Sequence, residues 1–553
     1  MTIGLPPLVF LERVTRVASD SSTSVTLPAS GTISGHANFP ANSRHVVVMW
    51  NARTTGTGTE DYALVRVNGD TGTNYDMQRT DAFGTSIAAF KETGINGWSQ
   101  IANMAGGAAH TSIYTPGWML MPHAFNTANY TSFTGMSGTA EQRVRIGTGN
   151  WENTAAITSV NFSLSSSYFV GHFDLYVVDE SYLVSSGEEI LGSDTNDFTN
   201  VSVPSQAGDI SLIHYTRSSR AATNDGIALD INGDTTGTNY ATHMIYAYNT
   251  TQTSFSTTSA SQGNQIGGTD AATADTYHYG SSITTVNAFN YGANDPHVNS
   301  LSGHLSVSTA DAWIGTANMR RNNVAAVTSV NASRTVGGNQ WKSGSGQWVY
   351  AVPKTLLERK ELSSDTTSVT FTLSGLTIPA GSTHLRLNCY IKTNDGSNQG
   401  VNLTLNGDTT AANYDLQYNY ADGASSSAAT SGANQNVQLL PGSGTANAFG
   451  GGAIIFPNYK SSDRHQSYLS FAATGPNTAT MLMSGRWEND AAIATITLQP
   501  GSGDFLDGSV FELDAVAGPI LGWSGIVSGV DGPQAVSGVD KTDIEKVMGV
   551  ASA

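Results

Sequence analysis

Three aspartates with the same neighbours could supply the oxygen ligands of a metal ion. Asp70, Asp234 and Asp408 stand in the phrases NGDTGTNY, NGDTTGTNY and NGDTTAANY, which begin at residues 68, 232 and 406. Carboxylates beside Thr hydroxyls and loop carbonyls form the hard oxygen environment that Ca²⁺ prefers, although the spacing is not that of an EF-hand. Calcium at these aspartates is therefore one interpretation of the motif.

The flanking residues favour a structural interpretation of the same aspartates. Each follows an Asn-Gly pair, which tolerates the positive φ angles of a tight turn, and Asp or Thr side chains often bond the amides of such turns. A Tyr ends each phrase, and a turn with a Tyr more often anchors a loop through a buried ring than contacts a ligand. The residues of this repeated motif are Asn68, Gly69, Asp70, Tyr75, Asn232, Gly233, Asp234, Tyr240, Asn406, Gly407, Asp408 and Tyr414.

Two tryptophans are candidates for a ligand or subunit contact. Trp151 and Trp487 are each followed by Glu and Asn, a set that could form an aromatic sugar platform with a polar rim. Arg321 stands at the corresponding place in the middle of the chain, which is hard to reconcile with a glycan site in every copy. We therefore expect the indoles to pack on the end of a sandwich or at a contact between subunits.

The sequence lacks the patterns of common catalytic sites. It contains no His-Glu-x-x-His zinc helix, Gly-x-Ser-x-Gly elbow, Walker loop or Rossmann fingerprint. His45, His214 and His384 occupy similar strand positions, where a half-buried packing role is the usual one. A carboxylate pair like that of a glycan-cleaving enzyme need not be visible in sequence. We expect a protein without catalytic residues or a resident cofactor.

The repeated phrases divide the chain into tandem modules. A second phrase follows the first at a similar distance and reads WENTAAITSV from 151, RNNVAAVTSV from 321 and WENDAAIATI from 487. Two independent phrases in the same order indicate repeats of about 170 residues. The predicted divisions are modules at 1–185, 186–355 and 356–517, called repeats 1, 2 and 3 below, and a tail at 518–553.

Each module has the pattern of antiparallel β-structure. Residues 45–50 form a continuous apolar run typical of a buried strand, and Ala63, Val65 and Val67 alternate before the Asn-Gly pair. Strand, turn and returning strand is the simplest interpretation of that pair. We expect an all-β protein of three tandem antiparallel β-sandwich modules of the jelly-roll type.

Long, weakly patterned stretches lie inside the modules, at 79–140, 247–312 and 418–480. Unstructured loops of this length are uncommon unless they are functional. We expect decorated insertions that carry short strands and binding or packing surfaces.

Composition excludes several classes of function. The chain has 553 residues with 25 Lys and Arg against 43 Asp and Glu, a net charge of -18, so a nucleic-acid binder is not expected. The single cysteine, Cys389, lies in an apolar run and is expected in a core. No apolar run approaches the ~18 residues of a membrane span, and the first residues lack a basic signal-peptide region. We expect synthesis in a cytoplasm without secretion or membrane insertion.

The tail changes character. Residues 518–553 are rich in Gly and Val, and Thr542 with Glu545 forms a capping-box pattern that predicts a short helix at 543–548. Such a segment cannot bury itself, so we expect it to dock on repeat 3 or on another subunit.

The repeated NGD and NY residues, the closing pattern at Gly508, Ser509, Phe511 and Leu513, and the EKVMGV sequence at 545–550 resemble virion structural proteins of tailed bacteriophages. The resemblance covers all three modules and the tail. It implies a virion component made in the host cytoplasm, with other virion proteins as partners and a homo-oligomer, such as a trimer, as its state. A tail or fibre-associated protein whose outer loops bind a host-surface glycan is favoured.

Alternatives remain. A head decoration or cement protein belongs to the same class. A bacterial extracellular glycan-binding adhesin array is the alternative from another class, against which the absent signal peptide weighs, and a depolymerase is the least favoured.

Overall fold

The computed structural model describes residues 6–517 except 110, 141, 205–208, 222–223, 237–238, 258–264, 272–276, 288–295, 306–311, 322–324, 336–338, 353–355, 380–381, 395–399, 423–424, 433–434, 436, 438–448 and 474–478. Beyond these it describes only short strands between 526 and 540. The predicted tail helix at 543–548 lies outside the described residues. The described chain is all-β, with several antiparallel and mixed sheets consistent with multiple β-sandwich modules.

Repeat 1 contains a larger and a smaller group of strands. The larger has the order β1 (Leu8–Arg16), β12 (Phe169–Val178), β3 (Val46–Thr54), β8 (Thr115–Met121), β9 (Thr131–Thr139), β10 (Arg143–Trp151), β5 (Tyr75–Phe83), β6 (Ser86–Ile95). The smaller has the order β2 (Ser24–Leu27), β11 (Val160–Ser163), β4 (Glu60–Val67), β7 (Trp98–Ala105). A single parallel bridge between Arg53 and Ala105 joins the two groups.

Repeat 2 has the same arrangement in two separate sheets, and its first strand begins at Leu183, before the predicted division at 185. The larger is β13 (Leu183–Ile190), β24 (Gly346–Val352), β15 (Asp209–Thr216), β20 (Gly280–Asn287), β21 (His297–Leu305), β22 (Ala312–Arg321), β17 (Tyr240–Tyr248), β18 (Thr251–Thr257). The smaller is β14 (Val201–Ser202), β23 (Ser329–Arg334), β16 (Asn224–Ile231), β19 (Gln265–Asp270).

Repeat 3 follows the same strand order. Its larger sheet is β25 (Leu356–Glu361), β35 (Val510–Ala517), β27 (Ser382–Ile391), β31 (Gly450–Phe456), β32 (Gln466–Ala473), β33 (Ala479–Trp487), β29 (Tyr414–Asp422), β30 (Ser425–Gly432). Its smaller sheet is β26 (Val369–Thr372), β34 (Thr495–Pro500), β28 (Val401–Leu405). In the tail, β36 (Ile526–Val527) pairs with β37 (Val530–Asp531), and β38 (Ala535–Val536) with β39 (Val539–Asp540).

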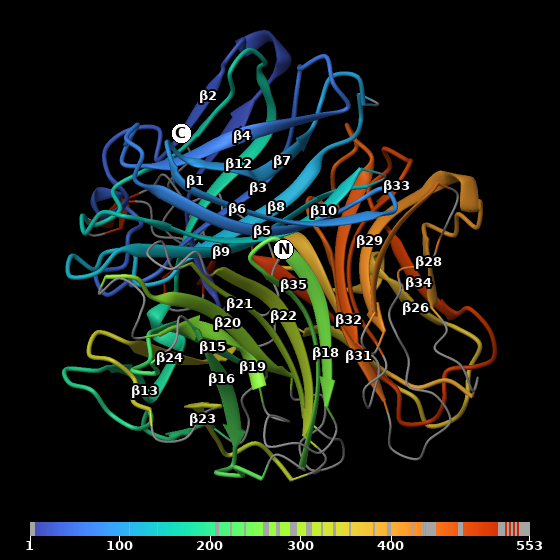
Figure 1. Ribbon diagram of the computed structural model, residues 1–553. Helices are drawn as coiled ribbons and strands as arrows, with labels where there is room; N and C mark the ends of the chain where they lie inside the picture. Colours follow the sequence, from blue (N-terminus) through green and yellow to red (C-terminus); the bar gives the residue numbers. More distant parts are fainter. Residues whose placement is uncertain are drawn as a thin grey trace.

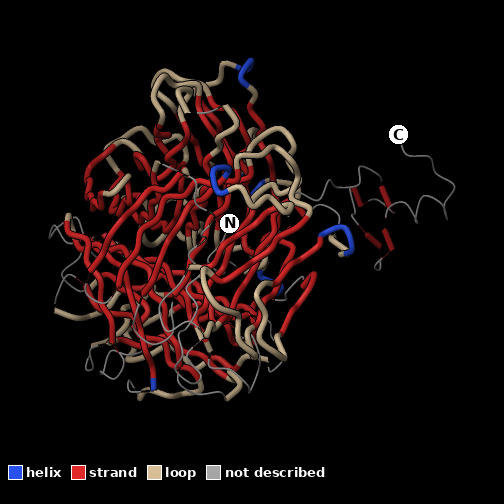
Figure 2. The backbone as a smooth tube through the Cα atoms, turned by 90° about the vertical axis from the view of Figure 1, so that its right-hand side faces the viewer, coloured by secondary structure: helices blue, strands red, loops and turns tan. Residues whose placement is uncertain are grey.

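Strands dominate the described chain (Figure 2), and its helical segments are short 3-10 turns. These are η1 (Ala18–Asp20), η2 (Ile33–Gly35), η3 (Glu180–Tyr182), η5 (Leu373–Gly375) and η6 (Ala411–Asn413).

The predicted hairpin at each Asn-Gly pair is wrong. In repeat 1, β4 ends at Val67 and pairs with β11 and β7, whereas the next strand, β5, pairs with β10 and β6 in the other group. The turn therefore carries the chain across the sandwich instead of back along β4. The physical reason is that the Asn68 backbone amide donates to the carbonyl of Ser159, which precedes β11 on the neighbouring strand, at 3.0 Å.

The predicted insertions are also corrected, because their strands are integral to the sheets. In repeat 1 the stretch 79–140 contains β8, which pairs directly with β3, and β9, which pairs with β8 and β10. Every residue of β8 and β9 is buried. Strands covered on both faces do not alternate between polar and apolar residues, so their pattern resembled that of a loop.

The larger sheets are covered on both faces because the three repeats pack together. On β3, Val46, Val48 and Trp50 belong to the core inside repeat 1, while Val47 and Met49 belong to a different apolar cluster. We call this second set the central cluster, and it includes residues of all three repeats, such as Ile213 and Leu482. Figure 1 shows the corresponding arrangement as three lobes of blue, green and orange strands around a common centre.

Candidate functional site

The Asn of the repeated motif ties two distant phrases together. The backbone of Asn68 and Gly69 has φ angles of 54° and 66°, which Asn and Gly tolerate best. The Asn68 side chain donates to the Ala156 carbonyl at 2.8 Å and accepts from the Thr158 amide at 2.6 Å. Asn232 and Asn406 make the same contacts with the second phrase of their own repeats. The two sequence phrases recur together because they bond to each other.

The motif Tyr anchors the same turn from inside the sandwich. The Tyr75 hydroxyl accepts from the Val67 amide at 3.1 Å and donates to the Asp70 carbonyl at 3.2 Å. Tyr240 and Tyr414 repeat this pair of bonds, and all three rings are fully buried. Burial raises the pKa of each hydroxyl, so it stays protonated and available as a donor.

The motif Asp accepts bonds from N–H groups on several sides. One Asp70 oxygen accepts from the Gly72 amide at 2.8 Å, and the other accepts from Asn74 at 2.9 Å and from the Trp151 indole at 2.8 Å. Asp408 accepts in the same way from Thr410, Asn413 and Trp487. Burial acts to raise the pKa of Asp70, but the hydrogen bonds from Asn74, Trp151 and Gly72 lower it overall.

Arg321 takes the role of the tryptophan in repeat 2. Trp151 is the cross-strand partner of Tyr75, and Arg321 is the partner of Tyr240. The Arg321 Nε lies 3.4 Å from the Asp234 carboxylate. An indole N–H and a guanidinium N–H therefore serve one function at this position, namely to donate to the motif Asp.

These contacts favour the structural interpretation of the motif. Donor N–H groups surround each carboxylate with partial positive charge, which is the environment of an anion and not of a bound Ca²⁺. Trp151 and Trp487 are each 1% exposed, so neither indole offers a face to a sugar or to another subunit. The geometry supports a folding role for the motif.

The tyrosine contacts lead to a testable prediction. Tyr414→Phe removes the hydroxyl that joins the Leu405 amide to the Asp408 carbonyl. The Leu405 amide then lacks its partner beside the core, whereas the Asp408 carbonyl keeps its bond from Gln435 at 3.1 Å. We expect a loss of about 1–3 kcal/mol in the free energy of unfolding, measured by urea denaturation. Tyr182→Phe at an exposed tyrosine is the control and should change it little. Equal stability of the two variants would contradict the anchor role.

The three strand histidines are buried and hydrogen-bonded within the fold. His45 Nδ1 accepts from the His123 amide at 3.1 Å, and His384 Nδ1 accepts from the Asn458 amide at 3.1 Å. Burial, together with nearby His123 and Arg44, lowers the pKa of His45 well below its usual range. His214 lies against the Ser282 hydroxyl at 3.0 Å.

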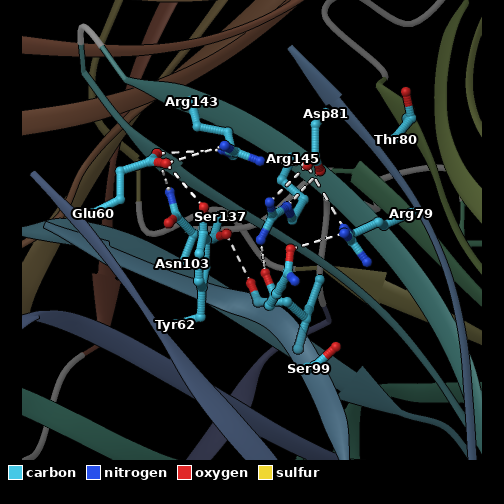
Figure 3. Close-up of polar contacts among 12 residues, drawn as sticks. Glu60, Tyr62, Arg79, Thr80, Asp81, Ser99, Asn103, Ser137, Arg143 and Arg145 are labelled. Atoms are coloured by element: carbon cyan, nitrogen blue, oxygen red, sulfur yellow. Dashed lines mark hydrogen bonds and ion pairs between the residues drawn. The ribbon is translucent and has the colours of Figure 1, made fainter. Parts of the chain in front are cut away.

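Repeat 1 also contains a buried ionic cluster, which the sequence reasoning missed. Figure 3 shows Arg79, Asp81, Arg143 and Arg145 of the larger group meeting Glu60 of the smaller one. Asp81 lies 2.7 Å from both Arg143 and Arg145, and Arg143 lies 3.1 Å from Glu60. Asp81 and Arg145 are each 1% exposed.

The cluster holds the Asp81 carboxylate in the charged form. Burial acts to raise the pKa of Asp81, but Arg145, Arg79 and Arg143 outweigh it and lower the pKa overall. Asp81 is therefore a poor proton donor near neutral pH, unlike the acid of a glycosidase pair. The arrangement can bind the two layers of repeat 1 together.

The cluster is specific to repeat 1. The positions of Asp81 and Arg143 hold Tyr246 and Trp313 in repeat 2, whose rings stack with centroids 5.8 Å apart. In repeat 3 they hold Tyr420 and Ala479. Aligning the repeats by their motif would have revealed this difference in the sequence.

Equivalent hydrogen bonds join neighbouring repeats. Gln78 of repeat 1 donates to the Asn249 carbonyl of repeat 2 at 2.6 Å, and Gln417 of repeat 3 donates to the Gly84 carbonyl of repeat 1 at 3.2 Å. Gln78 and Gln417 each lie three residues after the motif Tyr. Gln252 of repeat 2 donates to Asn419 of repeat 3 at 2.9 Å. Each repeat therefore contacts both others, and the three form a closed ring.

Two equivalent glycines allow the repeats to approach closely. A Cβ on Gly138 would lie 2.6 Å from Ser484 of repeat 3, and a Cβ on Gly303 would lie 2.5 Å from Thr148 of repeat 1. Thr148 and Ser484 each lie three residues before the motif Trp. The backbones at these contacts leave no room for a side chain.

This packing predicts that Gly303→Ala destabilises the protein. The added methyl group must displace Thr148, so we expect a loss of about 1–3 kcal/mol in the free energy of unfolding, measured by chemical denaturation. Gly192→Ala is the control, because a Cβ there meets no atom within 4 Å. Equal stability of the two variants would show that repeats 1 and 2 are not packed at this point.

Comparisons with known proteins identify no close relative. No family model matches the chain, and no curated protein matches it. An exo-β-1,3-galactanase from Phanerochaete chrysosporium is 9% identical over 84% of this chain and 95% of its own, with a TM-score of 0.12. A structure described as the triple jelly roll fold and turret assembly of an archaeal virus is 9% identical over 94% and 100%, with a TM-score of 0.10. TM-scores this low carry no argument about this chain.

Within the described ranges, no helix has the length and apolar character needed to cross a membrane.

Proposed function

We propose that the chain is a non-enzymatic structural component of a tailed-bacteriophage virion, in a tail or fibre-associated position. In this proposal each repeat is a jelly-roll-like β-sandwich module. The alternation of successive strands between two layers supports the jelly-roll assignment. In repeat 1, β1 and β3 belong to the larger group, whereas β2 and β4 belong to the smaller one.

The observation that carries the proposal is the closed ring of repeats. A homotrimer places three equal copies around an axis, and a ring of three packed repeats provides nearly the same arrangement from one chain. Such a unit suits a position of three-fold or quasi-three-fold symmetry in a particle. The ring would take the place of the trimer that is common among fibre proteins.

The recurring side chains support a structural role. The motif Asn, Asp and Tyr residues are bonded within their own repeats, and the carboxylate of Asp81 is neutralised by arginines. What the repeats share therefore serves folding. Contact with a host-surface glycan is assigned to the outer loops, and contact with other virion proteins to the tail.

The test locates the chain in a particle. Mass spectrometry of purified virions should find it at a fixed copy number, and electron microscopy with a Fab fragment against the chain should label the tail or its fibres. Labelling of the head surface would replace the tail assignment with the decoration alternative. Absence of the chain from purified virions would overturn the proposal.

A further inference from the structure

A second group of polar side chains lies where repeat 1 meets repeat 2. It consists of Asp76 on β5, Glu152 directly after β10, and His278 just before β20. One ligand atom from each residue lies within 4.8 Å of the other two. Asp76 is 0% and His278 1% exposed, while Glu152 is half-buried. We call these three residues the junction triad.

The buried aspartate has an unsatisfied oxygen. Asp76 Oδ1 accepts from the Gly94 amide at 2.8 Å, but Oδ2 is buried and has no hydrogen-bond donor. The Glu152 carboxylate is the nearest acidic neighbour of Asp76 and adds a second negative charge. Two carboxyl groups in contact, one of them fully buried, are stabilised either by a shared proton or by a cation between or beside them.

Repeat 3 shows how the same pair is neutralised elsewhere in the chain. Asp415 and Glu488 follow Tyr414 and Trp487, as Asp76 and Glu152 follow Tyr75 and Trp151. The Arg486 guanidinium contacts both Asp415 and Glu488. In repeat 1 the residue at the position of Arg486 is an asparagine. Its amide donates to a carbonyl of repeat 2 at 2.9 Å, so it brings no charge to the pair.

His278 of repeat 2 stands beside the carboxylates instead. Its Nε2 lies 3.3 Å from Glu152 Oε1. The Tyr130 ring packs edge-on against the imidazole with centroids 5.1 Å apart and holds it in place. A neutral imidazole nitrogen with two carboxylate oxygens is a donor set that suits zinc and related first-row ions, whereas Ca²⁺ and Mg²⁺ favour oxygen alone.

The separation between His278 and Glu152 also suits zinc. Tetrahedral bonds of about 2.0–2.1 Å place neighbouring ligand atoms about 3.3 Å apart, which is the separation observed between His278 and Glu152. We propose that Asp76, Glu152 and His278 bind one divalent transition-metal ion of the zinc class, which joins repeat 1 to repeat 2. The half-buried Glu152 marks the side from which the ion and a water ligand enter.

Metal binding to the full chain tests the proposal. The protein, freed of any histidine tag and treated with EDTA, is titrated with Zn²⁺ by calorimetry, and Co²⁺ absorption reports tetrahedral coordination. We expect one Zn²⁺ per chain and a raised melting temperature, with no displacement by excess Ca²⁺ or Mg²⁺. Zinc binding at the same affinity in His278→Gln or Glu152→Gln, or no zinc binding in the unmodified chain, would overturn the proposal.

A second variant introduces into repeat 1 the arginine that neutralises the acidic pair of repeat 3. Asn150→Arg places a guanidinium next to Asp76 and Glu152, so it should abolish zinc binding while the melting temperature without metal stays near or above that of the unmodified chain. Retained zinc binding in this variant would also count against the triad. The matched control is His465→Gln beside the arginine-bound pair of repeat 3, which should bind zinc like the unmodified chain.

Discussion

Asp81→Ala is expected to lower the free energy of unfolding by about 3–5 kcal/mol, because it leaves buried arginines without their shared partner. Asp81 lies 2.7 Å from Arg143 and from Arg145, and Arg79 Nε lies 3.6 Å from the same carboxylate. Removal of the carboxylate leaves the guanidinium groups of Arg79, Arg143 and Arg145 close together without the negative charge that they share. Guanidinium chloride denaturation measures the loss, and Asp507→Ala at an exposed aspartate should change stability little.

A variant with the residues of repeat 2 at these positions separates the effect of the buried charges on stability from the effect of lost packing. Arg79→Met, Asp81→Tyr, Arg143→Trp and Arg145→Gly together replace the ionic cluster by the apolar set found at the same positions of repeat 2. Replacing a buried ionic network by apolar residues is often neutral or stabilising. This variant should therefore be more stable than Asp81→Ala. The reverse order would show that repeat 1 depends on its charges for folding.

Trp348→Ala is expected to cost about 3–5 kcal/mol and to loosen repeat 1 from repeat 2. Trp348 belongs to repeat 2 and is fully buried, but its ring packs edge-on against His45 of repeat 1 with centroids 4.7 Å apart. It also contacts His123 of repeat 1, with centroids 5.3 Å apart. Amide hydrogen exchange should therefore speed up around His45 and His123 as well as in β24.

Trp341→Ala is the matched control within repeat 2. Trp341 is equally buried, but it packs against Phe198 inside the same repeat with centroids 5.5 Å apart. The two variants should lose similar stability, while only Trp348→Ala should alter exchange in repeat 1. Unchanged exchange at His45 and His123 in Trp348→Ala would contradict the packing of the two repeats.

The motif was predictable because its interactions are local or lie within one repeat. Asn and Gly tolerate positive φ angles better than other residues, and the recurring Tyr indicated the anchor that Tyr75 provides. The direction that the chain takes after the turn, into the other group of strands, was not predictable. The pairing of β4 with β11, which are distant in sequence, determines that direction, and the sequence around Asn68 fits a hairpin equally well.

Other features were hidden because they depend on packing between repeats. Val47 and Met49 belong to the central cluster, so the outer face of their strand is apolar as well. The strand therefore lacks the alternation of polar and apolar residues that is typical of an ordinary sandwich strand. The ionic cluster was missed for a different reason. Arg79, Asp81 and Arg145 lie close only after β5 pairs with β10, although a comparison of repeats at these positions would have singled them out.

Distances between the three repeats test the central claim most directly. Thr71, Thr235 and Thr409 each follow the motif Asp, and all three are exposed. Spin labels attached in pairs to cysteines at these positions, with Cys389 replaced by Ala, give three distances by pulsed electron paramagnetic resonance. The closed ring predicts three similar distances. One distance close to the sum of the other two would indicate a linear array of modules and would contradict the ring.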